Sequence, residues 1–285
     1  MSSPKFRLTS RLQQILKKAE SEAINSKDRV LRPGHILTAC LSEKGGALGE
    51  LALHVEISLD LLRDDTRSSS SNNTVEIDFF HCLVSEEVAK VLEVSIGYMN
   101  RYNQIFINEG HVLKALMTTK VLEHCLTEET RELILTLATT SRDMITHLGN
   151  YTFPKLNTEQ IRKVNLDDEK MLVTFVEENF SKEWASTIKG AFMLNNPTVY
   201  VASSSNGSIV GFAAYDVYQN KKGYFGPMGV VTSNRTKGVG YSLLHHCLRD
   251  MKEAGYEYAI IGGAGPIEFY EKACNAVVIP LASKK

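Results

Sequence analysis

The stretch VVTSNRTKGVGYSLL, residues 230–244, decides the fold of the C-terminal half of this chain. It combines the end of an apolar strand, a loop that carries Arg235, Gly238 and Gly240, and the start of an amphipathic helix. Backbone N–H groups at a helix N-terminus bind the negative oxygens of a diphosphate, and glycines let the ligand approach the backbone closely. Arg235 and Lys237 add positive charge. The stretch therefore predicts a diphosphate-binding loop between a strand and a helix.

Two other phosphate-binding motifs are excluded. A Walker A loop ends in Gly-Lys-Ser/Thr, which is missing, and the dinucleotide-binding fingerprint has a third glycine where Leu243 stands. Strand-like runs at 198–202, 209–218 and 223–231 precede the loop, whereas a dinucleotide fold opens with its glycine loop after the first strand.

Farther from the loop, strands and helices alternate. Further strands are expected at 161–164, 258–261 and 276–280. Two helices are expected over 169–195, one over 238–254 and a short one over 267–273. The C-terminal half is therefore predicted to be a mixed-sheet α/β domain.

Three motifs follow one another in this half: FGPMGV at 225–230, the RxxGxG loop at 235–240 and GPIEFYEK at 265–272. In this order they resemble the GNAT acetyltransferase superfamily over about residues 160–280. The resemblance implies central strands that splay apart around the pantetheine arm of acetyl-CoA, and direct attack of an amine on the acetyl group in a ternary complex. The positions that match cofactor-binding residues are Val230 and Val231, where a backbone N–H would stabilise the oxyanion, and Arg235, Thr236, Lys237, Gly238, Val239, Gly240 and Tyr241 in the pyrophosphate loop.

Tyr270, in FYEK, matches the tyrosine that many GNAT enzymes use as general acid toward the departing CoA thiolate. A phenol, with a pKa near about 10, donates a proton without first being ionised. The other interpretation is an aromatic side chain that only packs between sheet and cofactor. The general base is left open, because the strand before the loop has no carboxylate. The candidates are a water chain and Asp216. Asp216 also fits a turn at a strand end.

The N-terminal half has helical periodicity and repeats itself. RLQQILKKAESEA from Arg11 is answered by EVAKVLEVSIGYM from Glu87, and GHILTACL from Gly34 by GHVLKALM from Gly110, in both cases 76 residues later. The pattern predicts helices throughout residues 8–147, in two copies. The polar run 66–74 is expected to be a mobile surface loop between them.

This paired pattern resembles the N-terminal domain of Clp ATPases over roughly residues 5–147, a double helical repeat that binds substrates and adaptors. The resemblance implies a protein or peptide ligand for this half. In relatives that recognise phosphorylated arginine an acidic residue precedes the histidine of each box, whereas Gly34 and Gly110 stand there in this chain. We interpret His35 and His111 as structural residues rather than zinc ligands, because no cluster with metal-ligand spacing accompanies them.

Composition limits the classes of function. The 285 residues carry a net charge of −1, with 43% hydrophobic and 23% charged residues. No basic field attracts nucleic acid, and no apolar run fits a membrane span or a signal peptide. The five cysteines are scattered and odd in number, so we expect reduced thiols in the cytoplasm. Cys274 is interpreted as a small packed residue, and no metal is expected.

These patterns predict a two-domain protein of the α + α/β class, with the helical repeat domain at 5–147, a linker at 148–160 and a GNAT N-acetyltransferase domain at 161–285. The acceptor amine, a small molecule or a protein, is left open. The alternative function is a non-catalytic CoA sensor or a peptide-binding adaptor. GNAT domains commonly end in a hairpin after the FYEK helix, and only AVVIPLASKK follows here. The sheet edge is therefore expected to need cover from the helical half or from a second subunit in a homodimer.

Overall fold

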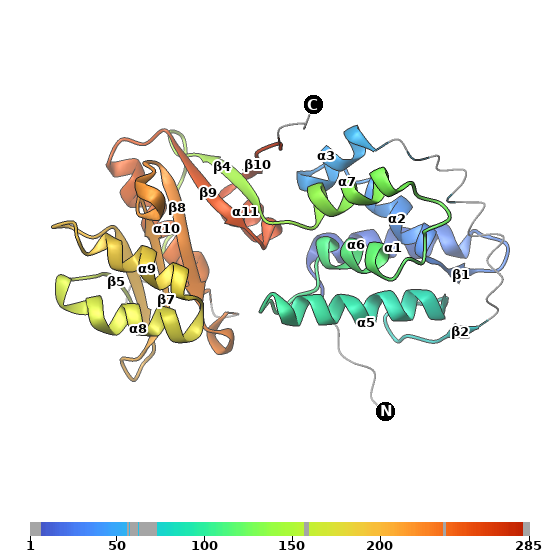
Figure 1. Cartoon of the computed structure of the whole chain (residues 1–285), viewed down its shortest axis with the longest axis horizontal. Coiled ribbons are helices and arrows are strands. Elements are labelled where there is room, and N and C mark those ends of the chain that lie inside the picture. Colours follow the sequence, from blue (N-terminus) through green and yellow to red (C-terminus); the bar gives the residue numbers. More distant parts are fainter. Residues whose placement is uncertain are drawn as a thin grey trace. The chain divides into compact units, whose positions relative to one another are not determined.

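The computed structural model describes residues 7–55, 57, 62, 73–156, 160–235 and 238–281, in two compact units (Figure 1). The first unit ends at Ser141 and takes in Pro280 and Leu281, and the second runs from Arg142 to Ile279. The boundary therefore lies at residue 141 and not in the expected linker, 148–160. Leu148, at the start of that segment, is fully buried in a core of the second unit.

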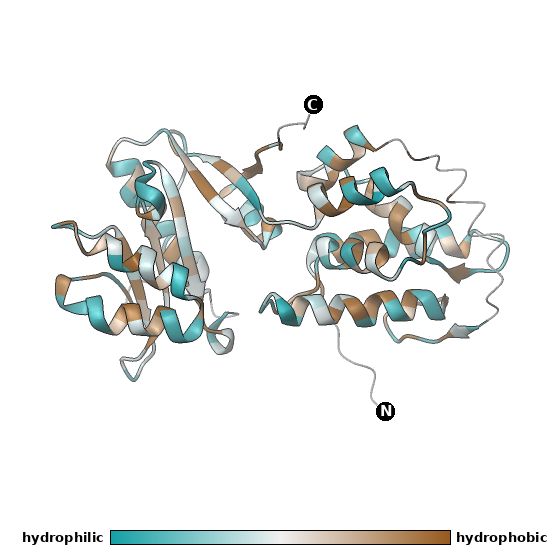
Figure 2. Ribbon diagram, in the orientation of Figure 1, coloured by the Kyte–Doolittle hydropathy of each residue, from teal (hydrophilic) through white to brown (hydrophobic). Residues whose placement is uncertain are grey.

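The first unit is a set of helices around one hydrophobic core, with three short strands. Hydrophobic and hydrophilic bands alternate along its helices (Figure 2), as expected where one face of a helix is buried. The strands pair in the order β1-β3-β2, a small sheet that the helical periodicity did not predict. The elements are α1 Ser10–Ile24, β1 Val30–Leu31, α2 Pro33–Leu41, α3 Gly46–His54, β2 Thr74–Val75, β3 Leu83–Ser85, α5 Glu86–Arg101, α6 Glu109–Thr118 and α7 Glu128–Ala138.

The two copies of the repeat exchange strand contacts reciprocally. Leu31 of the first copy pairs with Val84 of the second, and Leu8 pairs with Ile107. Positions 76 residues apart correspond, so Leu8 matches Val84 and Leu31 matches Ile107. The two contacts are therefore related by an approximate two-fold symmetry, and the duplication seen in the sequence is a feature of the structure.

The paired histidines cap the second helix of each copy. The Arg32 backbone N–H donates to Nδ1 of His35 at 3.1 Å, and the Asn108 N–H donates to Nδ1 of His111 at 3.2 Å. Burial lowers the pKa of His111 to about 4, which keeps the ring neutral and able to accept. These bonds support the structural interpretation of both residues. Within the described ranges, no three His, Cys, Asp or Glu side chains are grouped so as to hold a metal.

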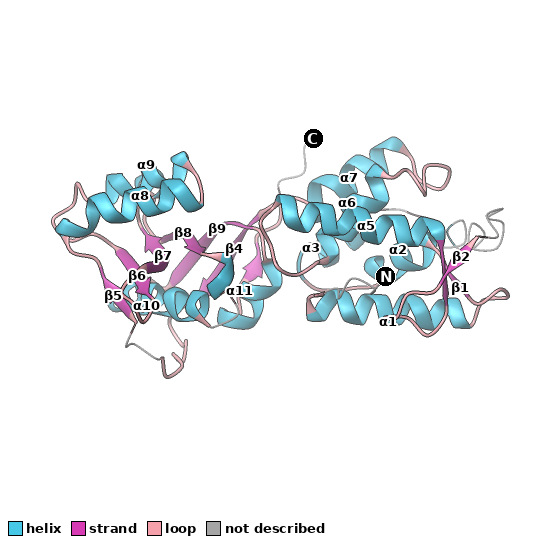
Figure 3. Ribbon diagram, turned by 90° about the horizontal axis from the view of Figure 1, so that it is seen from below, coloured by secondary structure: helices cyan, strands magenta, loops and turns pink. Residues whose placement is uncertain are grey.

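The second unit is a seven-stranded sheet in the order β10-β4-β9-β8-β7-β6-β5. Helices α8 and α9 lie on one face and α10 and α11 on the other (Figure 3). Only β8 and β9 are parallel neighbours. The elements are β4 Arg142–His147, β5 Ile161–Lys163, α8 Glu169–Asn179, α9 Lys182–Ala191, β6 Val199–Ser203, β7 Ile209–Tyr215, β8 Tyr224–Val230, α10 Val239–Glu253, β9 Tyr258–Ala264, α11 Ile267–Cys274 and β10 Val277–Val278.

Strand β4 corrects two expectations. The prediction of helix up to residue 147 is wrong there, because 142–147 alternate between inward and outward positions, the period of a strand. β4 precedes every other element of the unit, yet it lies between β9 and β10 (Figure 1). It is antiparallel to both. The edge of β9 is therefore covered from within the second unit, and neither the helical half nor a second subunit is needed for this.

Three expectations concern the chain as a whole. Most of the polar run 66–74 lies outside the described residues, and its last residue, Thr74, begins β2. None of the described helices is both long and apolar enough to cross a membrane. All five cysteines are free thiols in the structure.

Candidate active site

Strands β8 and β9 pair at only two positions, Tyr224 with Ile260 and Phe225 with Ile261. Beyond that point β8 stays paired with β7, and β9 stays paired with β4. Gly226, directly after the last pair, has a φ of +125°, which favours glycine. We call the diverging residues, 226–230 of β8 and 262–264 of β9, the strand fork. The central strands therefore splay as the sequence resemblance implied.

Val230 and Val231, predicted together, have different roles in the backbone. The Val231 N–H donates to the Val210 carbonyl at 2.9 Å, which uses it in the β7–β8 pairing. Successive N–H groups of a strand point to opposite sides, so the Val230 N–H points toward the fork. The Val230 carbonyl accepts from Nε of Arg235 at 2.8 Å. The N–H of Val230 is therefore the one placed to meet a carbonyl oxygen in the fork, and Arg235 fixes the loop that follows.

Helix α10 begins after the fork with an open N-terminus. Gly238 occupies the N-cap with a φ of +75° and no side-chain cap, a left-handed conformation that other residues rarely adopt. The Ser242 N–H donates to the Gly238 carbonyl at 3.0 Å, so the N–H groups of 239–241 precede the first intrahelical bond. A side chain at Gly240 would only touch Val230 and Phe269, at 3.6 and 3.9 Å. Thr236 and Lys237, also predicted here, lie outside the described residues.

Tyr270 lies on α11 with 7% of its surface exposed. Its ring meets that of Phe225, the last residue of β8 paired with β9, at 6.4 Å between centroids. Its hydroxyl forms no hydrogen bond with any described residue. Burial raises the pKa of Tyr270 well above its usual value, so the phenol stays protonated. The side chain therefore carries its proton at neutral pH, as a proton donor must.

Asp216 is a turn residue. It has a φ of +61°, its Oδ1 accepts from the Gly223 N–H at 2.7 Å, and its Oδ2 accepts from the Tyr256 hydroxyl at 2.7 Å. Asp216 directly follows β7, beside the first residue of β8. At about 3.3 Å per residue, the other end of β8, at Val230, lies roughly 20 Å farther along the strand. Both carboxylate oxygens are engaged in these hydrogen bonds, which supports the turn interpretation of Asp216.

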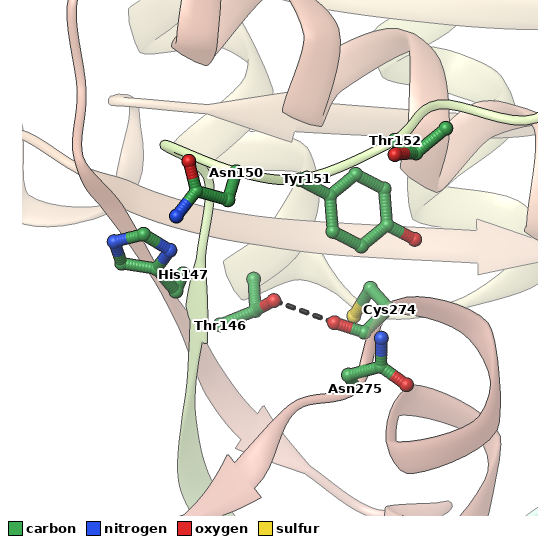
Figure 4. A pocket seen from close by; sticks show the side chains of 7 residues that line it. All are labelled: Thr146, His147, Asn150, Tyr151, Thr152, Cys274 and Asn275. Carbon is green, nitrogen blue, oxygen red and sulfur yellow. Dashed lines mark hydrogen bonds between the residues drawn. The ribbon is translucent and has the colours of Figure 1, made fainter.

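A shallow pocket lies beside β4 (Figure 4). The Thr146 hydroxyl donates to the Cys274 carbonyl at 2.6 Å at its base. Cys274 is fully buried, its thiol donates to the Tyr270 carbonyl at 3.2 Å, and burial raises its pKa to about 11. A protonated, enclosed thiol is not a nucleophile, as the sequence interpretation held. The pocket is lined by Thr146, His147, Asn150, Tyr151, Thr152, Cys274 and Asn275, none of them predicted as a site residue.

His245 is a fully buried titratable group on α10. Its ring lies 4.4 Å from that of Tyr241 and 5.7 Å from that of Tyr151, between centroids. Burial lowers the pKa of His245 from 6.5 to about 4. The buried, neutral ring therefore helps to anchor α10, and a proton on it is unfavourable.

Acid is expected to destabilise the second unit through His245. Between pH 6.5 and about 4 the unfolded chain binds a proton that the folded state excludes. The free energy of unfolding therefore falls as the pH falls through this window, by up to about 3 kcal/mol. Thermal unfolding followed by Trp184 fluorescence reports on this unit, because Trp184 is the only tryptophan and lies on α9. Between pH 7 and pH 5 the Tm of the His245→Leu variant should fall by less than that of the unmodified protein. An equal fall in both proteins would contradict this role.

One residue near the fork was missed by the sequence analysis. Asp143 lies on β4, which the predicted domain boundary assigned to the helical half. Its carboxylate accepts a hydrogen bond from Tyr224, the first residue of β8. The alternation of RDMITH over 142–147, with Ile and Thr in it, is the signal that predicts a strand there.

Two family models match this chain, one in each unit. Residues 7–129 match the Clp repeat (R) N-terminal domain, and residues 163–276 match the acetyltransferase (GNAT) family. The resemblances drawn from the GHIL and GHVL boxes and from the RxxGxG loop are confirmed, and so is the order of a helical repeat domain and a mixed-sheet domain. No curated protein matches the sequence.

The solved structures that the chain is similar to include examples of both kinds. The N-terminal domain of the chaperone ClpD from Arabidopsis thaliana is 19% identical, with 48% of this chain and 97% of that chain covered and a TM-score of 0.36. A GCN5-related N-acetyltransferase from Sphaerobacter thermophilus is 20% identical, with 57% and 65% covered and a TM-score of 0.39. A GCN5-related glucosamine N-acetyltransferase region of a fungal multi-domain GH3 beta-N-acetylglucosaminidase is 15% identical, with 60% and 27% covered and a TM-score of 0.43. The chain thus spans about a quarter of the fungal chain.

Proposed function

We propose that this protein is an acetyl-CoA-dependent N-acetyltransferase that transfers the acetyl group to an amine by direct attack on the thioester. The observation that carries the proposal is the open N-terminus of α10 directly after the strand fork, inside the region that matches the GNAT family. Three consecutive N–H groups, at 239–241, precede the first intrahelical bond and suit the oxygens of a diphosphate. Arg235, Thr236, Lys237 and Gly238 precede them, and the missing side chain of Gly240 leaves the backbone accessible.

The reacting group belongs in the fork. The Val230 N–H would donate to the carbonyl oxygen of the thioester and stabilise the negative charge that forms there during attack. Tyr270 would give its phenolic proton to the sulfur as the carbon–sulfur bond breaks. Its hydroxyl suits this role because no described residue is recorded as holding it in a hydrogen bond.

The first unit gives the proposal its second part. Because it matches a Clp repeat N-terminal domain, we propose that it binds a protein or peptide, which either carries the acceptor amine or regulates the enzyme. A cytoplasmic location and a homodimer stay predictions. The alternative, a CoA sensor without turnover, would bind acetyl-CoA but release no CoA in the presence of amines. An enzyme would release it.

Binding of acetyl-CoA tests the proposal. The Gly240→Asp variant introduces a carboxylate beside the proposed diphosphate site, and a Cβ at this position meets its neighbours only at ordinary contact distances. Acetyl-CoA affinity measured by calorimetry should fall by about 10- to 100-fold or more, the worth of charge-assisted hydrogen bonds. The matched control is Gly97→Asp on α5, where a side chain also meets open space. No binding to the unmodified protein, or equal binding to both variants, would overturn the proposed function.

A further inference from the structure

Strand β9 bulges opposite Asp143. Arg142 is level with Ala264 and Met144 with Ile261, so the single residue between them on β4 faces two residues, Gly262 and Gly263. Gly263 has a φ of +56°, the left-handed conformation typical of a bulge glycine. Bulges redirect side chains and are common beside active sites. This one lies immediately past Ile261, where β8 and β9 separate.

The bulge holds the Asp143 carboxylate by one oxygen. Oδ1 accepts from the Gly263 N–H at 2.8 Å and from the Tyr224 hydroxyl at 3.3 Å. For Oδ2 the described structure records no partner, and the Asp143 side chain is exposed. One oxygen therefore fixes the carboxylate, and the other is left to bind a ligand.

The Tyr224 side chain crosses β9 above Gly262 to reach Asp143 on β4. A Cβ at Gly262 would lie 2.0 Å from the Tyr224 hydroxyl oxygen, so no larger residue fits beneath the ring. Burial, and next the charge of Asp143, raise the pKa of Tyr224 to about 12. The phenol therefore remains a hydrogen-bond donor to the carboxylate. This arrangement therefore needs both glycines of the bulge. Gly263 provides the left-handed conformation, and Gly262 leaves room for the Tyr224 ring.

Asp143 and Tyr270 lie on opposite faces of the sheet. Met144, the neighbour of Asp143, belongs with Ile261 and Tyr270 to the core cluster beneath α10. Because successive side chains of a strand alternate between faces, Asp143 points to the other face, on the side of α8 and α9. A group that takes a proton and a group that gives one therefore flank the root of the fork from the two sides.

We propose that Asp143 binds the acceptor as a primary ammonium ion and takes a proton from it, which makes it the general base of the reaction. The inference rests on the proposed function. The freed lone pair of the amine forms the new bond to the thioester carbon, and the electron pair of the broken carbon–sulfur bond goes to sulfur, which takes the Tyr270 proton. The nitrogen of the new amide loses its surplus proton through water to the Tyr270 phenolate, and Asp143 releases the first proton to solvent.

Two amines of different basicity test the role of Asp143. Ethanolamine is protonated at neutral pH and needs a base, whereas hydroxylamine is largely neutral there and does not. In the full-length Asp143→Asn variant, release of CoA with ethanolamine should fall by about 100-fold or more, the usual contribution of a general base. Release with hydroxylamine should change by less than about fivefold, because no proton has to be removed before attack. Asparagine keeps the oxygen that accepts from Gly263, so the strand should keep its position.

The control is Asp216→Asn, which alters a carboxylate held in the same way by a backbone N–H and a tyrosine hydroxyl, but at the β7–β8 turn. It should leave the ratio of the two rates unchanged. Equal losses with both amines in Asp143→Asn would show a structural role and overturn the inference. Acetyl-CoA binding by the unmodified protein without transfer to either amine would overturn it as well. Absence of acetyl-CoA binding would instead remove the proposed function on which it rests.

Discussion

Removal of strand β4 is expected to abolish folding of the second unit. A fragment of residues 142–285 should fold, whereas one of residues 149–285 should not, although both keep the whole region that matches the GNAT family. Without β4, β10 loses its pairing partner and β9 loses one of its two partners. The core also loses Met144, which is fully buried. The loss exceeds what one side chain contributes and is comparable with the whole stability of a domain, about 5–15 kcal/mol.

Far-UV circular dichroism and Trp184 fluorescence of the two fragments measure this effect. In the intact chain, Met144→Asp places an unpaired charge in the same core and should also unfold the second unit. Ile145→Asp is the matched control, because its side chain points to the opposite face and is only half-buried. A folded fragment of residues 149–285 would contradict the role assigned to β4.

Loss of the Tyr270 hydroxyl is expected to slow the reaction by about 100-fold or more. In Tyr270→Phe the ring keeps its contacts with Phe225 and Phe269, so the fold and the affinity for acetyl-CoA should be preserved. The thiolate then leaves without a proton donor, and kcat falls while the dissociation constant for acetyl-CoA does not change.

Tyr215→Phe is the control for this substitution. It removes a buried hydroxyl that donates to Asp250 in the last turns of α10 at 3.2 Å, and should lower stability but not kcat. An unchanged kcat in Tyr270→Phe would mean that water protonates the sulfur, and Tyr270 would then be a packing residue only.

The strand–loop–helix unit at 230–244 was predictable because its signals are local. A strand end, two glycines and a helix start lie within a dozen residues or so, and each has a conformational signature in the sequence. The duplication was predictable for a similar reason, since two boxes at the same offset need no knowledge of the fold.

The remainder depends on pairing between distant segments. Residues 142–147 come shortly after helix α7, and their alternation is short, so their place in the sheet depends on their partners on β9, far along the chain. Which N–H group faces the fork, that of Val230 or that of Val231, depends on how β8 pairs with β7. No sequence motif specifies this register. Asp143 was invisible as a site residue because its position comes from one extra residue in β9.

The reciprocal contacts between the two repeats bear on how the chain is made. Leu8 pairs with Ile107, which is synthesised roughly 100 residues after it. At ordinary rates of synthesis this is a delay of about 5–20 seconds. Until then the first copy has strand edges without partners, an arrangement that invites wrong pairings. Truncation of either copy should therefore leave strand edges of the other without partners.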